Sequence, residues 1–115
     1  MKYVYLIQIE GTDIYKVGYT KSHPSKRVES LQTGNPFKLV LVDFYETKRA
    51  SRVESAFHNR YRTNKVSEDE YKLLGEWFKF DFETRNKFKS VCEQIDNNFK
   101  VIEELSTLSN KKPNY

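Results

Sequence analysis

The N-terminal segment restricts the possible folds of this chain more strongly than any other part of the sequence. Residues 3–9 and 14–19 are rich in β-branched and aromatic side chains, which are typical of strands. Between them, the residues Glu-Gly-Thr-Asp at 10–13 predict a turn, and about four residues is a usual length for a hairpin loop. The sequence therefore predicts an N-terminal β-hairpin.

Apolar periodicity and capping residues predict the elements that follow the hairpin. A helix is expected to begin at Pro24 or Ser25 and to end at the Thr-Gly-Asn-Pro segment 33–36. Residues 38–45 include a near-continuous apolar run, which is typical of a central strand covered on both faces. Residues 50–61 predict a second helix with a buried stripe of Val53, Phe57 and Tyr61.

The C-terminal part of the chain is expected to be mainly helical. Residues 67–70 form a helix-start pattern before a short helical turn at 71–74, and an extended piece then runs through Phe82. A long helix is expected from Glu83 to about Leu108, with apolar residues at three- and four-residue steps. Its apolar face is broad enough to pack within the chain or against a second copy, which leaves a homodimer through this helix open.

The order of these elements predicts the α+β class, with a three-stranded, mainly antiparallel sheet flanked by helices and a long C-terminal helix. We divide the chain into a domain at residues 1–82, a helix at 83–108 packed on the same domain, and a polar tail at 109–115.

Composition excludes several classes of protein. The single cysteine, Cys92, excludes an intramolecular disulfide framework and a cysteine-based zinc cluster, and it is expected to pack in the last helix. No apolar run approaches the roughly 18 to 20 residues that cross a bilayer, and the N-terminus lacks the features of a signal peptide. We therefore expect an intracellular, cytoplasmic protein with no membrane partner.

The distribution of charge favours a polyanionic partner. The formal net charge is +4. Residues 1–65 carry twice as many Lys and Arg as Asp and Glu, whereas residues 66–115 carry a small acidic excess. Clustered basic side chains release counterions from a phosphate backbone when they bind it, so nucleic acid is the partner indicated. An ordinary solvated surface is the alternative interpretation.

Two short strand motifs, an arginine and a glutamate follow one another in a characteristic order. They are Tyr3-Val4-Tyr5, Tyr15-Lys16-Val17-Gly18, Arg27 on the first expected helix and Glu54 on the second. This arrangement resembles the GIY-YIG nuclease superfamily over roughly residues 3–80. Tyr5 is similar to the tyrosine of the first family motif, whereas Tyr3 stands where the family has glycine.

The second motif has two interpretations. Tyr15 matches the family's tyrosine if one residue is inserted before Gly18, whereas a match without a gap places Lys16 there. Side chains alternate along a strand, so Lys16 and Gly18 share one face and Tyr15 lies on the other, which favours Lys16. Lysine in this position is similar to a known variant of the family that cleaves DNA.

The resemblance implies hydrolysis of phosphodiester bonds with the help of a divalent metal ion. Glu54 would be the ligand of Mg²⁺ or Mn²⁺, and Arg27 would bind the scissile phosphate. Either Tyr5 or Lys16 would be the base that activates water, and the sequence leaves this choice open. His58 lies one helical turn after Glu54 and is a further catalytic candidate, as a proton carrier or as a neighbour of the metal ligand.

Several basic and aromatic residues are candidates for contact with DNA. Gly75-Glu76-Trp77-Phe78 is similar to a Glu-Trp-Phe signature of a short branch of the family, common in phages, viruses and bacteria and often described as DNA-binding. The candidates are His23, Lys26, Lys48, Arg49, Arg52, Arg60 and Trp77.

The leading hypothesis is a small metal-dependent DNA endonuclease that acts inside a bacterial or virus-infected cell. One alternative keeps the fold without the chemistry, which leaves a catalytically silent DNA-binding module. A second alternative is an interaction protein that uses its long C-terminal helix.

Overall fold

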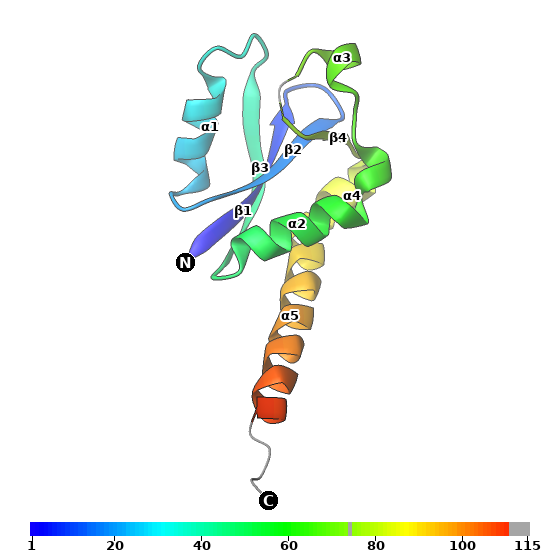
Figure 1. The fold of residues 1–115 in the computed structure, drawn as a ribbon. Coiled ribbons are helices and arrows are strands. Elements are labelled where there is room, and N and C mark those ends of the chain that lie inside the picture. The colour runs from blue at the N-terminus through cyan, green and yellow to red at the C-terminus, as the bar shows by residue number, and fades with distance from the viewer. Residues whose placement is uncertain (74, 111–115) are drawn as a thin grey trace, which may run out of the picture.

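The expected N-terminal hairpin is present in the computed structural model, which describes residues 1–73 and 75–110 (Figure 1). The strands are β1 (Lys2–Ile9), β2 (Ile14–Thr20), β3 (Leu39–Thr47) and β4 (Trp77–Lys79). The helices are α1 (Pro24–Gln32), α2 (Ala50–Arg60), the 3₁₀ helix η1 (Arg62–Asn64), α3 (Glu68–Tyr71), α4 (Phe82–Asn86) and α5 (Phe88–Asn110). The described residues include no helix that is long and apolar enough to cross a membrane.

The strands form one antiparallel sheet in the order β3-β1-β2-β4, which confirms the α+β class. The sheet has one strand more than predicted, because the expected extended piece pairs with β2 over Ile14–Lys16 as β4. The prediction that residues 38–45 form a central strand was wrong. β3 lies at an edge, although α1 packs on one of its faces and α5 on the other, and this accounts for its apolar run.

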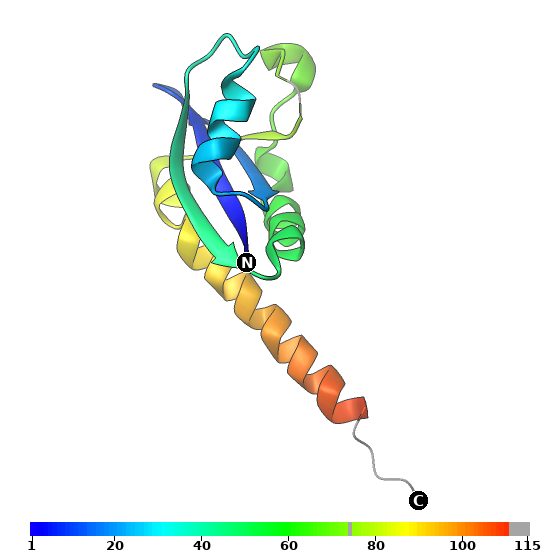
Figure 2. The same cartoon turned by 90° about the vertical axis from the view of Figure 1, so that its left-hand side faces the viewer.

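The two faces of the sheet carry separate apolar clusters. On one face, α2 covers β1 and β2 while α5 covers β3, and they bury Val4, Leu6, Tyr15 and Val17 together with Val53, Phe57 and Phe88. On the other face, α1 packs over Tyr5, Ile7, Ile9, Leu39 and Trp77 (Figure 2). Because side chains alternate along a strand, neighbours such as Val4 and Tyr5 enter opposite clusters.

The C-terminal helix differs from the prediction in two ways. It is divided at Lys87 into α4 and α5, and Asp81 caps α4 by accepting a hydrogen bond from the Thr84 backbone N–H at 2.7 Å. The first half of α5 packs on the domain, with Cys92 fully buried as predicted. Its second half extends beyond the sheet (Figures 1 and 2) and exposes more than half of each of its large apolar side chains: Val101, Ile102, Leu105 and Leu108.

Two short stretches qualify the remaining predictions. The helical turn expected at 71–74 forms earlier, as α3, because Ser67 accepts a hydrogen bond from the Glu70 backbone N–H at 3.4 Å. Leu74 lies outside the described residues. The expected tail at 109–115 begins in the last turn of α5, and residues 111–115 are not among those described.

Candidate functional site

Tyr5 is buried beneath α1, at the centre of the sheet. It pairs across the strands with Gly18 of β2. A Cβ atom at position 18 would collide with the Tyr5 hydroxyl and ring, so only glycine leaves room for this tyrosine. The glycine of the second motif therefore has a steric function: it places the Tyr5 hydroxyl against the neighbouring strand.

Lys16 lies two residues before Gly18 on the same face of β2. Its Nζ atom is 5.4 Å from the centroid of the Trp77 ring. Gly75 lies next to the same amine, because a Cβ atom at position 75 would stand only 2.8 Å from Nζ. Burial lowers the pKa of Lys16, and the nearby Arg27 lowers it further, while Glu54 and Glu76 act in the opposite direction. The site therefore disfavours the charged form of Lys16.

Arg27 enters the site from the first helix of the chain. His23 caps α1 because its ring accepts a hydrogen bond from the Ser25 backbone N–H, and Pro24 is the first residue of the helix. The Arg27 guanidinium donates a hydrogen bond to Tyr5, yet burial outweighs this contact and raises the pKa of Tyr5. The Arg27 Nε atom is buried and has no hydrogen-bond partner in the described part of the chain. The fold therefore leaves one donor of this buried part of the guanidinium unsatisfied by the described residues.

Glu54 and His58 come from the opposite side of the sheet. α2 buries Val53 and Phe57 there, but β4 pairs with β2 only as far as Lys16. The edge of β2 is therefore open at Val17, whose carbonyl oxygen lies 2.6 Å from His58 Nε2. Glu54 is one helical turn earlier and places Oε1 at 3.4 Å from the same nitrogen.

The carboxyl group of Glu54 lies in an environment that does not fully stabilise its charge. Burial raises its pKa and Glu76 raises it further, whereas His58 and Lys16 lower it. Its side chain is still 18% exposed, so solvent and ligands can reach it.

Glu76 completes the arrangement from the segment before β4. Its Oε2 atom is 2.5 Å from His58 Nδ1, and its Oε1 atom is 2.9 Å from Lys65 Nζ. The hydrogen bond from Lys65 is the main cause of the lowered pKa of Glu76, and His58 lowers it too. The sequence indicated no partner for Glu76. The helical spacing of Glu54 and His58 predicts that these two residues are neighbours, but it does not reveal which residue contacts the other nitrogen of the imidazole.

We call these six residues the edge cluster: Tyr5, Lys16, Arg27, Glu54, His58 and Glu76. All of them except Glu76 were candidates from the sequence, and these five come from four separate elements of the chain. The fold brings them together where the edge of β2 is open. The remaining catalytic candidate, Tyr15, does not join the edge cluster. It lies on the other face, where it receives a hydrogen bond from Gln8 at 3.2 Å and contacts the Phe80 ring.

Arg49 and Arg52, near the start of α2, form ion pairs with acidic residues of α5. Arg49 is buried and donates to Asp96 at 3.1 Å and to Glu103 at 2.9 and 3.0 Å. Arg52 donates to Glu103 at 3.0 Å and covers the Phe99 ring. The prediction that Arg49 contacts DNA was therefore wrong, because ion pairs to α5 already satisfy its guanidinium. We call this group, with Tyr45 bonded to Asp96, the α5 ion cluster.

The other candidates for contact with DNA fall into three groups. Trp77 is 3% exposed within the apolar cluster, so it cannot offer its ring face to a base. His23 caps α1 and contacts the rings of Tyr3 and Phe44. Lys26 and Lys48 are exposed, and Arg60 is exposed beside Gln94 of α5 at 3.3 Å.

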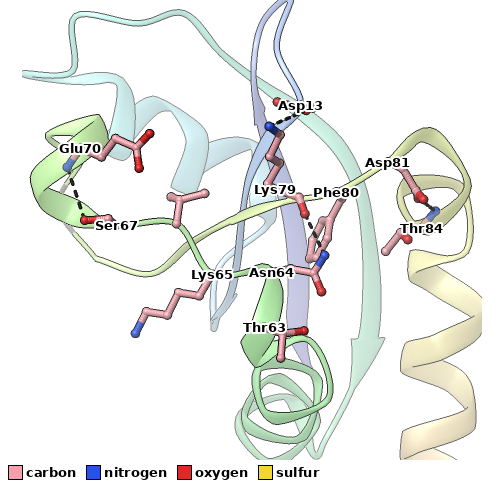
Figure 3. A pocket seen from close by; sticks show the side chains of 11 residues that line it. Asp13, Thr63, Asn64, Lys65, Ser67, Glu70, Lys79, Phe80, Asp81 and Thr84 are labelled. Atoms are coloured by element: carbon pink, nitrogen blue, oxygen red, sulfur yellow. Dashed lines mark hydrogen bonds and ion pairs between the residues drawn. The ribbon is translucent and has the colours of Figure 1, made fainter.

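A hollow of about 660 Å³ lies near β4 but apart from the edge cluster (Figure 3). The polar groups around it bond with one another: Ser67 with Glu70, Asn64 with the Lys79 carbonyl oxygen, and Asp81 with Thr84. No residue of the edge cluster lines it. A smaller hollow of about 260 Å³ adjoins the edge cluster, with Lys16 and Trp77 in its wall.

Glu54 fits a divalent ion held by a single protein ligand. Within residues 1–73 and 75–110, no group of three or more His, Cys, Asp or Glu side chains is arranged to hold a metal. Mg²⁺ keeps several waters and commonly binds through one or two carboxylates plus substrate phosphate oxygens. A partly exposed carboxylate of this kind could hold an ion that arrives together with a phosphate.

An α+β domain with Tyr, Lys, Arg and Glu side chains gathered at an open sheet edge has the features of a nuclease-like domain. Comparison with protein families agrees with this class. Residues 2–102 match the T5orf172 domain, a nuclease-like domain family of phages, and the chain belongs to this family. No curated protein and no solved structure matches the chain.

Proposed function

We propose that this protein is a small divalent-metal-dependent DNA endonuclease that hydrolyses phosphodiester bonds by a GIY-YIG-type mechanism with one metal ion. The observation that carries the proposal is the edge cluster. Tyr5, Lys16, Arg27 and Glu54 stem from four elements on two sides of the sheet, yet they interact electrostatically with one another. Perturbed ionisable groups of this kind concentrate at functional sites.

Each side chain has a role that follows from its surroundings. Arg27 would bind the scissile phosphate through its guanidinium and balance charge in the transition state. Glu54 would hold Mg²⁺ or Mn²⁺, which supplies Lewis-acid stabilisation of the phosphate and of the leaving oxygen.

Lys16 is the better candidate for the base. A base must accept a proton from water, and a lowered pKa increases the unprotonated fraction of Lys16. The pKa of Tyr5 is raised, so its phenol keeps its proton and would orient the water or the phosphate through hydrogen bonds. We therefore assign proton transfer to Lys16 and positioning to Tyr5.

The exposed basic side chains supply the contact with DNA in this proposal. Lys26 lies one residue before Arg27 on α1, while Lys48 lies before α2. Their contribution would depend on salt and not on base sequence, because it comes from phosphate contacts.

The test is a cleavage assay on supercoiled, linear duplex and single-stranded DNA with Mg²⁺, Mn²⁺ or EDTA. The wild-type protein should cut with metal only, and Glu54→Ala should abolish cutting while binding to DNA persists. Glu104→Ala, which removes an exposed carboxylate on α5, is the matched control and should cut normally. Salt-sensitive binding without cutting by the wild-type protein would instead identify a silent DNA-binding module.

A second candidate function is association through α5. The exposed apolar side chains at the end of this helix favour it, and a second copy of the chain is the partner to test. Leu105→Asp should then change the sedimentation behaviour of the protein, whereas a monomer at all concentrations would dismiss the idea.

A further inference from the structure

A continuous chain of contacts joins Glu76, His58 and Glu54. The proposed reaction gives Glu54 a role in metal binding but assigns no role to the other two residues. Glu76 Oε2 lies 2.5 Å from His58 Nδ1, and His58 Nε2 lies 3.4 Å from Glu54 Oε1. The chain thus links the segment before β4 to the carboxylate that faces Lys16.

The imidazole of His58 is held at both nitrogens. The Val17 carbonyl oxygen can only accept a hydrogen bond, so Nε2 must carry the hydrogen of that 2.6 Å contact. At the other nitrogen, Glu76 and Nδ1 share a hydrogen bond. The ring also contacts Phe78, with centroids 5.0 Å apart. Two opposed hydrogen bonds and a packed face leave the ring one orientation.

Glu76 itself is drawn toward this ring, although its side chain is about half exposed. Lys65 holds the other carboxylate oxygen at 2.9 Å, so Glu76 is fixed between one cation and one imidazole. The Glu76 side chain could otherwise point into water, but these two contacts hold it against His58. His58 in turn is held beside Glu54.

We propose that Glu76 and His58 are positioning residues, which fix the Glu54 carboxylate in the orientation needed to bind the metal ion. This inference rests on the proposed function, since Glu54 is a metal ligand only there. Residues that contact a metal ligand and fix its orientation change metal affinity or activity by about 10- to 100-fold when they are removed.

The first experiment is NMR of the histidine side chains with Mn²⁺ as the probe. The chain has two histidines, so His23→Gln assigns the signals of His58. Low concentrations of Mn²⁺ should broaden the His58 signals in the wild-type protein, and Glu54→Gln should remove the broadening. Glu76→Ala should raise the Mn²⁺ concentration needed by about tenfold.

Two further variants separate orientation from charge. Glu76→Gln lacks the charge but keeps an amide that can donate to or accept from Nδ1, so it should restore Mn²⁺ binding to within about threefold of wild type. Lys65→Met removes one of the two contacts that hold Glu76 but leaves its contact with His58, so its effect should lie between those of Glu76→Gln and Glu76→Ala. If Glu76→Gln binds Mn²⁺ as weakly as Glu76→Ala, charge alone acts and the proposal is overturned.

The second experiment measures cleavage as a function of Mn²⁺ concentration. Glu76→Ala and His58→Ala should each raise the half-saturating Mn²⁺ concentration, and the double variant should be no worse than His58→Ala, because Glu76 acts through His58. Effects that multiply would overturn the proposal. If the wild-type protein binds Mn²⁺ at His58 but does not cut, the proposed nuclease fails while the positioning role stands; if it does not bind Mn²⁺, both fail.

Discussion

The edge cluster and the α5 ion cluster contain similar residues, but the charged groups are paired in the α5 ion cluster and incompletely paired in the edge cluster. In the α5 ion cluster, each carboxylate of Asp96 and Glu103 meets donors, and Tyr45 adds a hydrogen bond to Asp96 at 2.8 Å. In the edge cluster, Arg27 Nε has no partner among the residues that the structure describes, and Lys16 and Glu54 have pKa values shifted toward their neutral forms. The first arrangement stabilises the fold, whereas the second keeps interactions available for a ligand.

The pKa shifts make the same distinction. Burial alone would raise the pKa of Asp96, but hydrogen bonds from Tyr45, Thr47 and Arg49 lower it, so the fold favours its charged form. The pKa of Glu54 is raised, mainly by burial. Two carboxyl groups of one small domain thus shift in opposite directions, because hydrogen-bond donors surround Asp96 whereas burial and the neighbouring Glu76 act on Glu54.

The largest expected effect comes from Arg27→Met. Cleavage should fall by about 100- to 1000-fold, because a donor aimed at transition-state charge is lost. The free energy of unfolding should change by less than about 1 kcal/mol, since the guanidinium is incompletely bonded in the free protein. Single-turnover cleavage and urea denaturation measure the two effects. A large loss of stability without loss of cleavage would reverse the roles of the two clusters.

Asp96→Ala should act on stability instead. It leaves the buried Arg49 with one of its carboxylates removed, which should cost about 3 kcal/mol. Cleavage by the folded fraction should be unchanged. The stabilising contribution of Asp96 is complete above its ordinary pKa of 3.8 and is lost as the pH falls through its lower folded value. Urea denaturation between neutral and acid pH should therefore show a weaker pH dependence in the variant than in the wild type.

Lys16→Met should stabilise the protein while it abolishes cleavage. The pKa of Lys16 is lowered in the fold, so its charged form opposes folding at neutral pH. Removal of that charge should raise the free energy of unfolding by about 1 kcal/mol at pH 7. The gain should shrink as the pH rises through the folded pKa toward the ordinary value of 10.5. Lower stability of the variant at pH 7 would show that the charge of Lys16 is compensated after all.

The smallest effect is expected for Arg52→Ala at the rim of the α5 ion cluster. The side chains of Arg52 and Glu103 are 50% and 42% exposed, and ion pairs in such surroundings contribute little. The melting temperature should fall by less than about 3 °C, and added salt should reduce the difference. A fall as large as that of Asp96→Ala would show that burial does not decide the strength of these pairs.

Local patterns in the sequence predicted the hairpin and the faces of its strands. Alternation along β2 placed Lys16 and Gly18 together and Tyr15 apart, which the two apolar clusters confirm. Ser67 and the segment after it predicted the start of α3 through a local hydrogen bond. Each of these features depends on residues close in the chain.

The features that were missed depend on residues far apart in the chain. The position of β3 at an edge follows from strand order, which its own apolar run does not encode. β4 has three residues, too few to show a period. Arg49 resembled a free basic residue because its partners, Asp96 and Glu103, lie 47 and 54 residues away.

The open edge of β2 also bears on how copies of this protein behave at high concentration. An unpaired strand edge is a template on which another chain can add a strand and begin aggregation. At Val17, the carbonyl oxygen that would accept the incoming backbone N–H is already bonded to His58. The imidazole thus protects the sheet from edge-to-edge association, and its loss would be measured in solubility as well as in the chemistry of the site.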